Sequence, residues 1–161
     1  MAKSNVALIA SALCILALAG FAQCRLQFAQ QFSVEGRIYC DTCRLQFVTR
    51  ISNYISGATV RLECRDRQDG GNVTYTTEGL TGADGQYSLP VPGDHEGEIC
   101  EVIAVSSPDA ECNEPTLERA RISLAMNSGI ASENRYANYL GFLRTETLPE
   151  CAEVIQELTL V

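Results

Sequence analysis

The chain has 161 residues, 46% of them hydrophobic, which is enough apolar material for the core of one globular domain. Its formal net charge of −8 excludes a protein that seeks nucleic-acid phosphates or an anionic membrane surface, because both depend on clustered lysine and arginine. A basic partner, or no particular charged partner, is consistent with this acidity.

The N-terminal residues have the pattern of a secretory signal peptide. Lys3 supplies a positive charge, residues 6–18 form an uncharged apolar run, and the small residues Ala19, Gly20 and Ala22 follow. The run is shorter than the roughly 20 apolar residues that a membrane-spanning helix needs. The pattern therefore predicts a secreted protein in the extracellular space.

The number of cysteines favours one of two cleavage sites. Cleavage after Ala22 would leave seven cysteines in the mature chain, whereas cleavage after Cys24 leaves six, which can all pair. We therefore expect a signal peptide at residues 1–24 and a secreted β domain at residues 25–161.

The domain is predicted to consist of short strands separated by turns. In residues 58–64, Val60, Leu62 and Cys64 alternate with polar residues, as in a strand with one buried face. Further strands are expected at residues 32–39, 73–78, 86–91, 99–106 and 121–125, and an edge strand is expected at residues 140–143 after a long surface loop.

Some of the connections are also predictable. Asp84-Gly85 is expected to make the tight turn of a hairpin, because this dipeptide adopts the positive φ angles that such turns need. Pro90 and Pro92 are expected to stop the strand that follows. Residues 45–55 fit either a helical turn or a loop, and residues 150–158 have the spacing of a short C-terminal helix.

These elements together predict an all-β fold. We expect a disulfide-stapled antiparallel β-sandwich or barrel of about seven strands, with a short C-terminal helix. Residues 57–89 also resemble the prealbumin-like sandwiches, in which a G-A-x-V-x-L strand leads to a D-G-x-Y turn. That likeness concerns the fold and implies no function.

Six cysteines remain in the predicted mature chain, and secreted domains use such sets as disulfides. Six cysteines allow fifteen pairings. Cys40 and Cys43 form a C-x-x-C pair, which also occurs in redox and zinc sites. A redox pair begins a helix in a βαβ unit, and a zinc site needs a second ligand pair at matching spacing. The sequence offers neither context, so structural disulfides are favoured. The six are Cys40, Cys43, Cys64, Cys100, Cys112 and Cys151.

Residues 35–44, E-G-R-I-Y-C-D-T-C-R, resemble the signature of the Ole e I pollen-allergen and extensin-like family, with Ile38 where the family usually has Val. The later cysteines are in the same register, and G-D-H-E-x-x-I-C-E around Cys100 resembles the pollen-expressed, anther-specific branch. The motif positions in this chain are Glu35, Gly36, Tyr39, Cys40, Asp41, Thr42, Cys43 and Arg44.

The resemblance implies a pairing and a function. The implied disulfides are Cys40–Cys112, Cys43–Cys151 and Cys64–Cys100, and the third also suits the predicted strands, because Cys64 ends one and Cys100 begins another. The implied function is that of a non-enzymatic extracellular pollen protein, a ligand or interaction protein in pollen hydration and tube growth and an allergen. Its implied partner is a cell-surface protein such as the ectodomain of a receptor-like kinase.

Two other places in the sequence invite a functional interpretation. The sequon Asn72-Val73-Thr74 follows two glycines and predicts an exposed, glycosylated Asn72. His95 lies in an acidic segment, residues 93–98, that could suggest a hydrolase or a calcium loop. A hydrolase needs a nucleophile against the histidine, and calcium loops have a fixed alternation of oxygen ligands. Because neither pattern is recognisable, we expect a solvated turn, and no catalytic residue, metal or cofactor.

The alternative function is a cell-wall structural or carbohydrate-contacting module that binds wall polysaccharide. Tyr136, Tyr139 and Phe142 could form an exposed recognition patch for such a role. They could equally pack under the late loop as a small core, and the sequence does not distinguish the two. An enzyme or a protease inhibitor fits least well.

Overall fold

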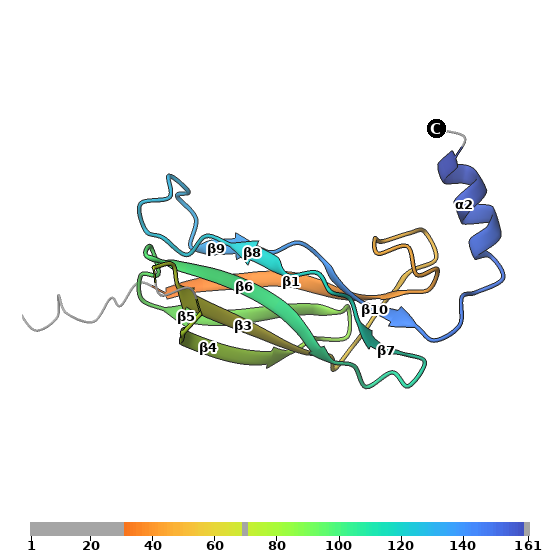
Figure 1. The fold of residues 1–161 in the computed structure, drawn as a ribbon, viewed down its shortest axis with the longest axis horizontal. Coiled ribbons are helices and arrows are strands. Elements are labelled where there is room, and N and C mark those ends of the chain that lie inside the picture. The colour runs from red at the N-terminus through yellow and green to blue at the C-terminus, as the bar shows by residue number, and fades with distance from the viewer. Residues whose placement is uncertain (1–30, 69–70, 160–161) are drawn as a thin grey trace, which may run out of the picture. The chain divides into compact units, whose positions relative to one another are not determined.

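The computed structural model describes residues 31–68 and 71–159, so the predicted signal peptide at residues 1–24 lies outside the described residues. The described residues contain ten strands and one helix (Figure 1). The elements are β1 (Gln31–Asp41), β2 (Asn53–Tyr54), β3 (Thr59–Asp66), β4 (Val73–Leu80), β5 (Gln86–Pro92), β6 (Glu98–Ser106), β7 (Cys112–Pro115), β8 (Ala120–Ile122), β9 (Asn134–Tyr136), β10 (Leu140–Arg144) and α2 (Cys151–Thr159).

Two sheets enclose one hydrophobic core. The first is built around β1, which pairs with β5 and β9 along its first half and with β2 and β10 along its second half, while β7 pairs with the far side of β10. The second has the order β4-β3-β6-β8. Val34 and Ile38 from the first sheet share the core with Val60, Leu62 and Val102 from the second. The predicted all-β sandwich with a C-terminal helix is confirmed.

The strand count and the pairing differ in detail from the prediction. Beyond the seven expected strands, the described residues include β2, β7 and β9, which have two to four residues and are too short to show a periodic pattern. The pairing is also not wholly antiparallel, because β1 runs parallel to both β9 and β10. In β3 the predicted alternation is confirmed, since Val60, Leu62 and Cys64 are buried.

The Asp84-Gly85 turn forms, but the hairpin prediction is wrong. Gly85 has φ 72°, and the Gly82 amide donates to the Gln86 carbonyl at 2.8 Å. The turn nevertheless joins strands of different sheets, because β4 pairs with β3 and β5 pairs with β1. The strand continues through Pro90 and ends at Pro92, the second of the two prolines expected to stop it. Because β5 pairs only with β1, the N–H group that proline lacks removes no hydrogen bond to a second neighbouring strand.

The late part of the chain contributes more to the core than expected. The edge strand predicted at residues 140–143 is instead internal, since β10 lies between β1 and β7, with Leu140 and Phe142 buried. Residues 45–55 form turns and loop rather than a helix, apart from the two residues of β2. The predicted helix is present as α2, of which Val154 is buried. No helix of the described residues is long and apolar enough to cross a membrane.

Candidate functional site

The motif at residues 35–44 occupies the second half of β1 and the turn that follows it. Gly36 pairs with Tyr87 of β5, and a Cβ at Gly36 would lie only 2.3 Å from the Tyr87 Oη. Glycine is therefore the residue that leaves room for this ring. Tyr87 is buried, its hydroxyl has no hydrogen-bond partner among the described residues, and burial raises its pKa far above the ordinary value.

Tyr39 packs against a glycine of β10, as Tyr87 packs against Gly36. It is buried, and its ring lies so close to the backbone of Gly141 that a Cβ there would be 2.8 Å from the Tyr39 Cζ. Burial raises the pKa of Tyr39 to about 12, and the carboxylates of Asp41 and Glu118 add to the shift. The phenol stays protonated at neutral pH and fills the space between two strands.

Asp41 organises the turn after β1. Its buried carboxylate accepts the Cys43 amide at 3.2 Å and the Gln46 amide at 2.5 Å. These bonds hold a turn in which Arg44 and Gln46 have positive φ angles of 58° and 63°. Such a conformation costs a non-glycine residue roughly 1 kcal/mol, which hydrogen bonds to a charged acceptor offset.

The turn is fastened to segments far along the chain. Arg44 donates to the Arg144 carbonyl at 2.7 Å and to the Glu114 carboxylate at 2.9 Å. The carbonyl of Thr42 accepts the Leu148 amide at 3.2 Å, just before α2. The motif thus connects β1 to β7, to β10 and to the C-terminal segment.

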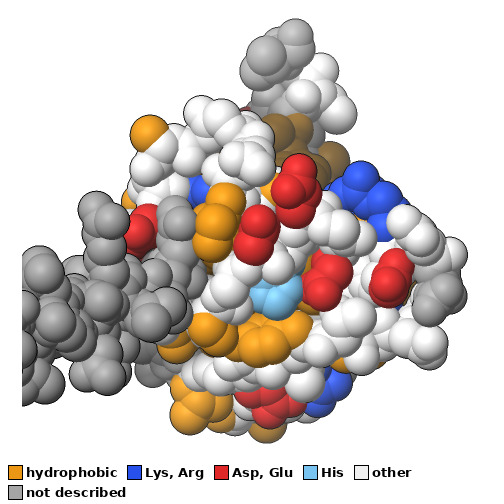
Figure 2. Space-filling model, turned by 90° about the vertical axis from the view of Figure 1, so that its left-hand side faces the viewer, with side chains coloured by type: hydrophobic (Ala, Val, Ile, Leu, Met, Phe, Trp, Pro, Cys, Tyr) orange, Lys and Arg blue, Asp and Glu red, His pale blue; other side chains and the backbone are white. Residues whose placement is uncertain are grey.

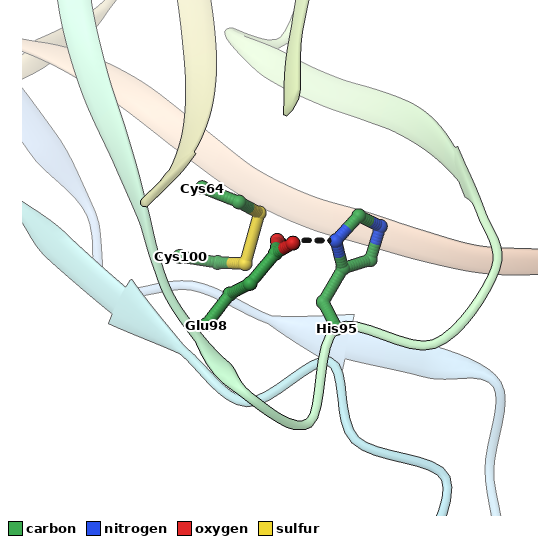
Figure 3. A group of neighbouring side chains, drawn as sticks. All are labelled: Cys64, His95, Glu98 and Cys100. Carbon is green, nitrogen blue, oxygen red and sulfur yellow. Dashed lines mark hydrogen bonds and ion pairs between the residues drawn. A yellow bond between two sulfur atoms is a disulfide. The ribbon is translucent and has the colours of Figure 1, made fainter. Parts of the chain in front are cut away.

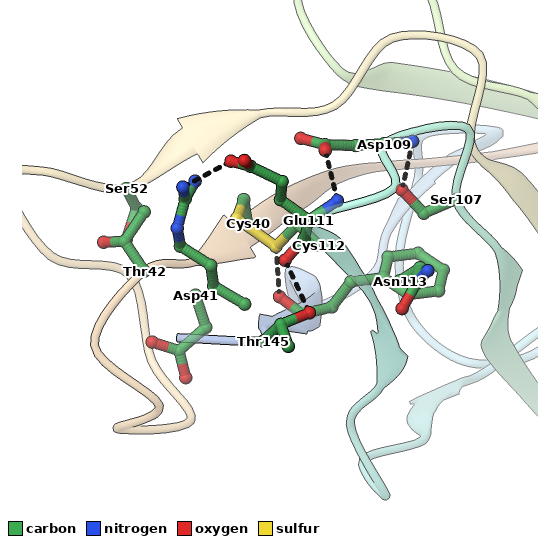
Figure 4. The surroundings of a disulfide bond; sticks show 12 residues. Cys40, Asp41, Thr42, Ser52, Ser107, Asp109, Glu111, Cys112, Asn113 and Thr145 are labelled. Carbon is green, nitrogen blue, oxygen red and sulfur yellow. Dashed lines mark hydrogen bonds and ion pairs between the residues drawn. A yellow bond between two sulfur atoms is a disulfide. The ribbon is translucent and has the colours of Figure 1, made fainter. Parts of the chain in front are cut away.

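Three disulfides link the part of the chain that the structure describes: Cys40–Cys112, Cys43–Cys151 and Cys64–Cys100, the pairs that the family resemblance implies. The first two start from the motif. Near the Cys40–Cys112 bond, hydrogen bonds between residues close in sequence hold the loop from β6 to β7. The Glu111 amide, for example, donates to the Asp109 carboxylate at 2.9 Å (Figure 4). The side chains of Tyr39, Asp41 and Arg44 and the two motif cysteines therefore hold the fold together.

His95 is less exposed than a solvated turn would allow, and that prediction is wrong for its side chain. The side chain is 9% exposed, and its Nδ1 lies 2.6 Å from the Glu98 carboxylate (Figure 3). Its Nε2 lies 3.2 Å from the Pro92 carbonyl. The Tyr75 ring covers it at a centroid distance of 5.1 Å. Both ring nitrogens face acceptors, so His95 holds the loop together.

The residues around His95 resemble a metal site only in composition. Cys64, His95, Glu98 and Cys100 offer ligand atoms within 4.8 Å of one another. Cys64 and Cys100 are joined in a disulfide, however, and metals bind the thiolate form of cysteine. His95 and Glu98 already satisfy each other, so the group does not fit a metal ion.

Carboxylates gather on the surface around this histidine. Figure 2 shows the histidine among several acidic side chains on one face of the molecule. Asp94 and Glu96 are exposed there, whereas Glu98 is half-buried against His95. Asp94 also accepts the amides of Glu96 and Met126, each at 3.2 Å, so it ties the loop to the following segment. Glu96 is therefore the carboxylate of this loop that is free to meet a partner.

The three late aromatic residues divide between surface and core. Phe142 is buried in the core, while Tyr136 and Tyr139 are 72% and 42% exposed. The two tyrosines line one cleft of about 350 Å³ whose polar lining includes Glu35, Arg37 and Gln86.

A second pair of residues extends this aromatic surface. Tyr54 of β2 meets Tyr139 edge to face, with centroids 6.3 Å apart, and the Arg37 guanidinium lies 4.9 Å from the centre of the Tyr54 ring. Exposed tyrosine and arginine side chains are enriched where proteins bind their partners. This is the surface patch that sequence reasoning located only in part.

The comparisons with known proteins assign a family. The family model described as "Pollen protein Ole e 1 like" matches residues 30–159. The chain belongs to this family. It is 49% identical to pollen allergen Che a 1 of Chenopodium album, over 99% of this chain and 96% of that protein. It is also 49% identical to the anther-specific protein LAT52 of Solanum lycopersicum, over 99% and 97% of the two chains.

A solved structure of a pollen allergen supports the same fold. The crystal structure of the major plantain pollen allergen Pla l 1 superposes with a TM-score of 0.69 at 34% identity, over 75% of this chain and 99% of that one. The relatives are pollen allergens and anther-specific proteins, which agrees with the resemblance found in the motif.

Arg135 is a fold-stabilising residue of this Ole e 1 family member that sequence reasoning missed. It is buried, donates to the carbonyls of Ser123, Ser132 and Asn134, and lies 4.7 Å from the centre of the Phe32 ring. A single arginine in a polar loop gives no sign of burial in the sequence, because its partners are backbone carbonyls.

Proposed function

We propose that this protein is a secreted, non-enzymatic pollen protein that acts as an extracellular ligand in pollen hydration and tube growth. Its proposed partner is a basic surface on a cell-surface protein such as the ectodomain of a receptor-like kinase. The pollen and anther relatives support the setting. The engagement of both His95 ring nitrogens supports a non-enzymatic role.

The acidic loop at residues 93–98 is the observation that carries the proposal. Its exposed carboxylates stand on a loop held by the His95–Glu98 contact and by the Asp94 hydrogen bonds. A fixed cluster of like charge speeds encounter with an oppositely charged surface, because it steers diffusion before contact.

A charge-neutral Glu96→Gln variant tests this role. We expect its association with pollen receptor-like kinase ectodomains to slow about threefold at low ionic strength and to be almost unchanged at high salt. Glu146→Gln is the matched control, since Glu146 is an exposed carboxylate outside the loop and the change in net charge is the same. Surface plasmon resonance at several salt concentrations measures the rates. Equal slowing by both variants would contradict a role for the loop.

A second candidate function is supported by the tyrosine cleft. We propose that Tyr136 and Tyr139 contact a cell-wall polysaccharide, because sugar hydroxyls both donate and accept hydrogen bonds and the cleft offers both kinds of group in Arg37, Glu35 and Gln86. Neutral contacts of this kind do not depend on salt.

Replacing Tyr136 and Tyr139 by alanine is expected to reduce retention on immobilised pollen-tube wall polysaccharide at least tenfold, since both rings are removed from the cleft. Retention by the unaltered protein should persist at high salt. Phe47→Ala is the control, because Phe47 is an exposed aromatic outside the cleft. Retention that disappears in salt, or that the control reduces equally, would rule out the cleft as a sugar site.

A further inference from the structure

One edge of the sandwich lacks the usual protection against pairing with another chain. Six strands of the described residues have a neighbour on one side only: β2, β4, β5, β7, β8 and β9. Proteins protect such edges with short strands, proline or lysine, because unpaired N–H and C=O groups accept a foreign strand.

Five of these edges are protected. Four of them, β2, β7, β8 and β9, have only two to four residues. The fifth, β5, is longer but contains Pro90 and Pro92. The remaining edge, β4, runs for eight residues, V-T-Y-T-T-E-G-L, without proline, and its one irregularity, opposite Cys64 and Arg65, is confined to its N-terminal end. Lysine is not available for protection, since Lys3 is the only lysine of the sequence.

The β4 edge suits a second copy of the same chain. It carries one charge, Glu78, which Arg61 already neutralises at 2.6 Å, so this edge escapes the repulsion expected between two strongly acidic chains. Two antiparallel copies related by a twofold axis at Thr76 or Thr77 would place threonine against threonine. In either register Glu78 would face a threonine of the partner rather than its own counterpart.

The glycosylation sequon lies where it would control this edge. Asn72 is exposed and directly precedes β4. In the Thr76-centred register, Asn72 lies opposite Leu80 of the second copy, so a glycan would occupy the space of the incoming strand. The side chain of Thr74, the third sequon residue, donates to the Cys64 carbonyl at 2.9 Å and faces this domain's own β3.

We propose that β4 is a self-association edge and that an N-glycan on Asn72 keeps it closed. The glycan thus prevents β4 from pairing with another chain, as proline or a short strand does at the other edges. The glycosylated chain is a monomer, and the chain without the glycan pairs through β4 into a dimer with one continuous sheet.

Sedimentation of the chain secreted from plant cells tests this proposal. The unaltered protein should carry a glycan on Asn72, seen as added mass on the peptide, and should sediment as a monomer. Asn72→Gln should double the mass at the same protein concentration and slow amide hydrogen exchange in β4. Thr74→Ser keeps the sequon and should remain monomeric. Removal of the glycan from the folded glycoprotein provides a second route to the exposed edge.

A second substitution locates the interface. In the Asn72→Gln background, Thr76→Asp should restore the monomer, because the new carboxylate would face either itself or Glu78 of the partner. Thr147→Asp, an equal charge change at an exposed threonine outside β4, should leave the dimer intact. Three results would each overturn the proposal. They are a secreted protein whose Asn72 carries no glycan, an Asn72→Gln variant that stays monomeric, and a dimer that the Thr76→Asp change does not affect.

Discussion

Removing the Cys40–Cys112 disulfide by a double change to serine is expected to lower the free energy of unfolding by about 4 kcal/mol. The bond closes a loop of 72 residues, and the chain-entropy model assigns about this value to such a loop. Both cysteines are buried, Cys40 in β1 and Cys112 at the start of β7, so the native state keeps the residues in place while the unfolded chain gains freedom.

The Cys43–Cys151 bond should matter less, although its loop of 108 residues is longer. Cys151 begins α2, whose other attachments are the buried Val154 and the exposed pairs of Arg50 with Glu153 and Glu157. Exposed ion pairs contribute less than about 1 kcal/mol each. Without the bond, α2 gains freedom in the native state as well as in the unfolded state. The difference in chain entropy between the two states therefore changes little.

Urea unfolding and hydrogen exchange distinguish these two outcomes. The Cys43→Ser/Cys151→Ser variant should lose about 1 kcal/mol of global stability and the exchange protection of α2 alone. If its loss equalled or exceeded that of the Cys40→Ser/Cys112→Ser variant, loop length rather than location would determine the contribution of these bonds.

Gly36→Ala is expected to destabilise the domain by about 3 kcal/mol. The new methyl group would lie 2.3 Å from the Tyr87 Oη and 2.7 Å from its Cζ, and the buried ring has no solvent into which to move. Overpacking of this kind costs about 1–3 kcal/mol, and the central position of β1 places the effect at the upper end.

Tyr87→Phe provides the test of this mechanism. Alone it should be neutral or stabilise by about 1 kcal/mol, because it removes a buried hydroxyl that has no hydrogen-bond partner within residues 31–68 and 71–159. Combined with Gly36→Ala it should recover part of the loss, which a double-mutant cycle in urea measures. Gly97→Ala is the control, since a Cβ there meets no atom within 4 Å. Strict additivity of the two changes would refute the clash.

Local patterns in the sequence predicted local structure well. The alternation in β3 and the spacing in α2 need no information beyond a few neighbouring residues, and both are confirmed. The Asp84-Gly85 turn was predicted for the same reason. Which strands the turn joins depends on partners elsewhere, and there the prediction failed. The internal position of β10 depends on β1, about a hundred residues earlier.

The site residues show the same division. The motif named the residues of the turn after β1, but the carboxylate of Asp41 acquires its role only from the amide positions of that turn. His95 was expected in a solvated turn because its segment has neither the pattern of a hydrolase site nor that of a calcium loop. Its burial comes from Tyr75 and from the Leu124 carbonyl, which accepts the His95 amide, and neither is adjacent in sequence.

The pairing of β1 has a consequence for biosynthesis. β1 is the first strand of the described domain to be translated, yet two of its partners, β9 and β10, are among the last. The growing chain therefore carries an incomplete first sheet until β9 and β10 have been synthesised, and native assembly of that sheet must wait for these two strands. We infer that the Cys43–Cys151 bond forms only after β10 has been synthesised, because Cys151 follows that strand in the sequence.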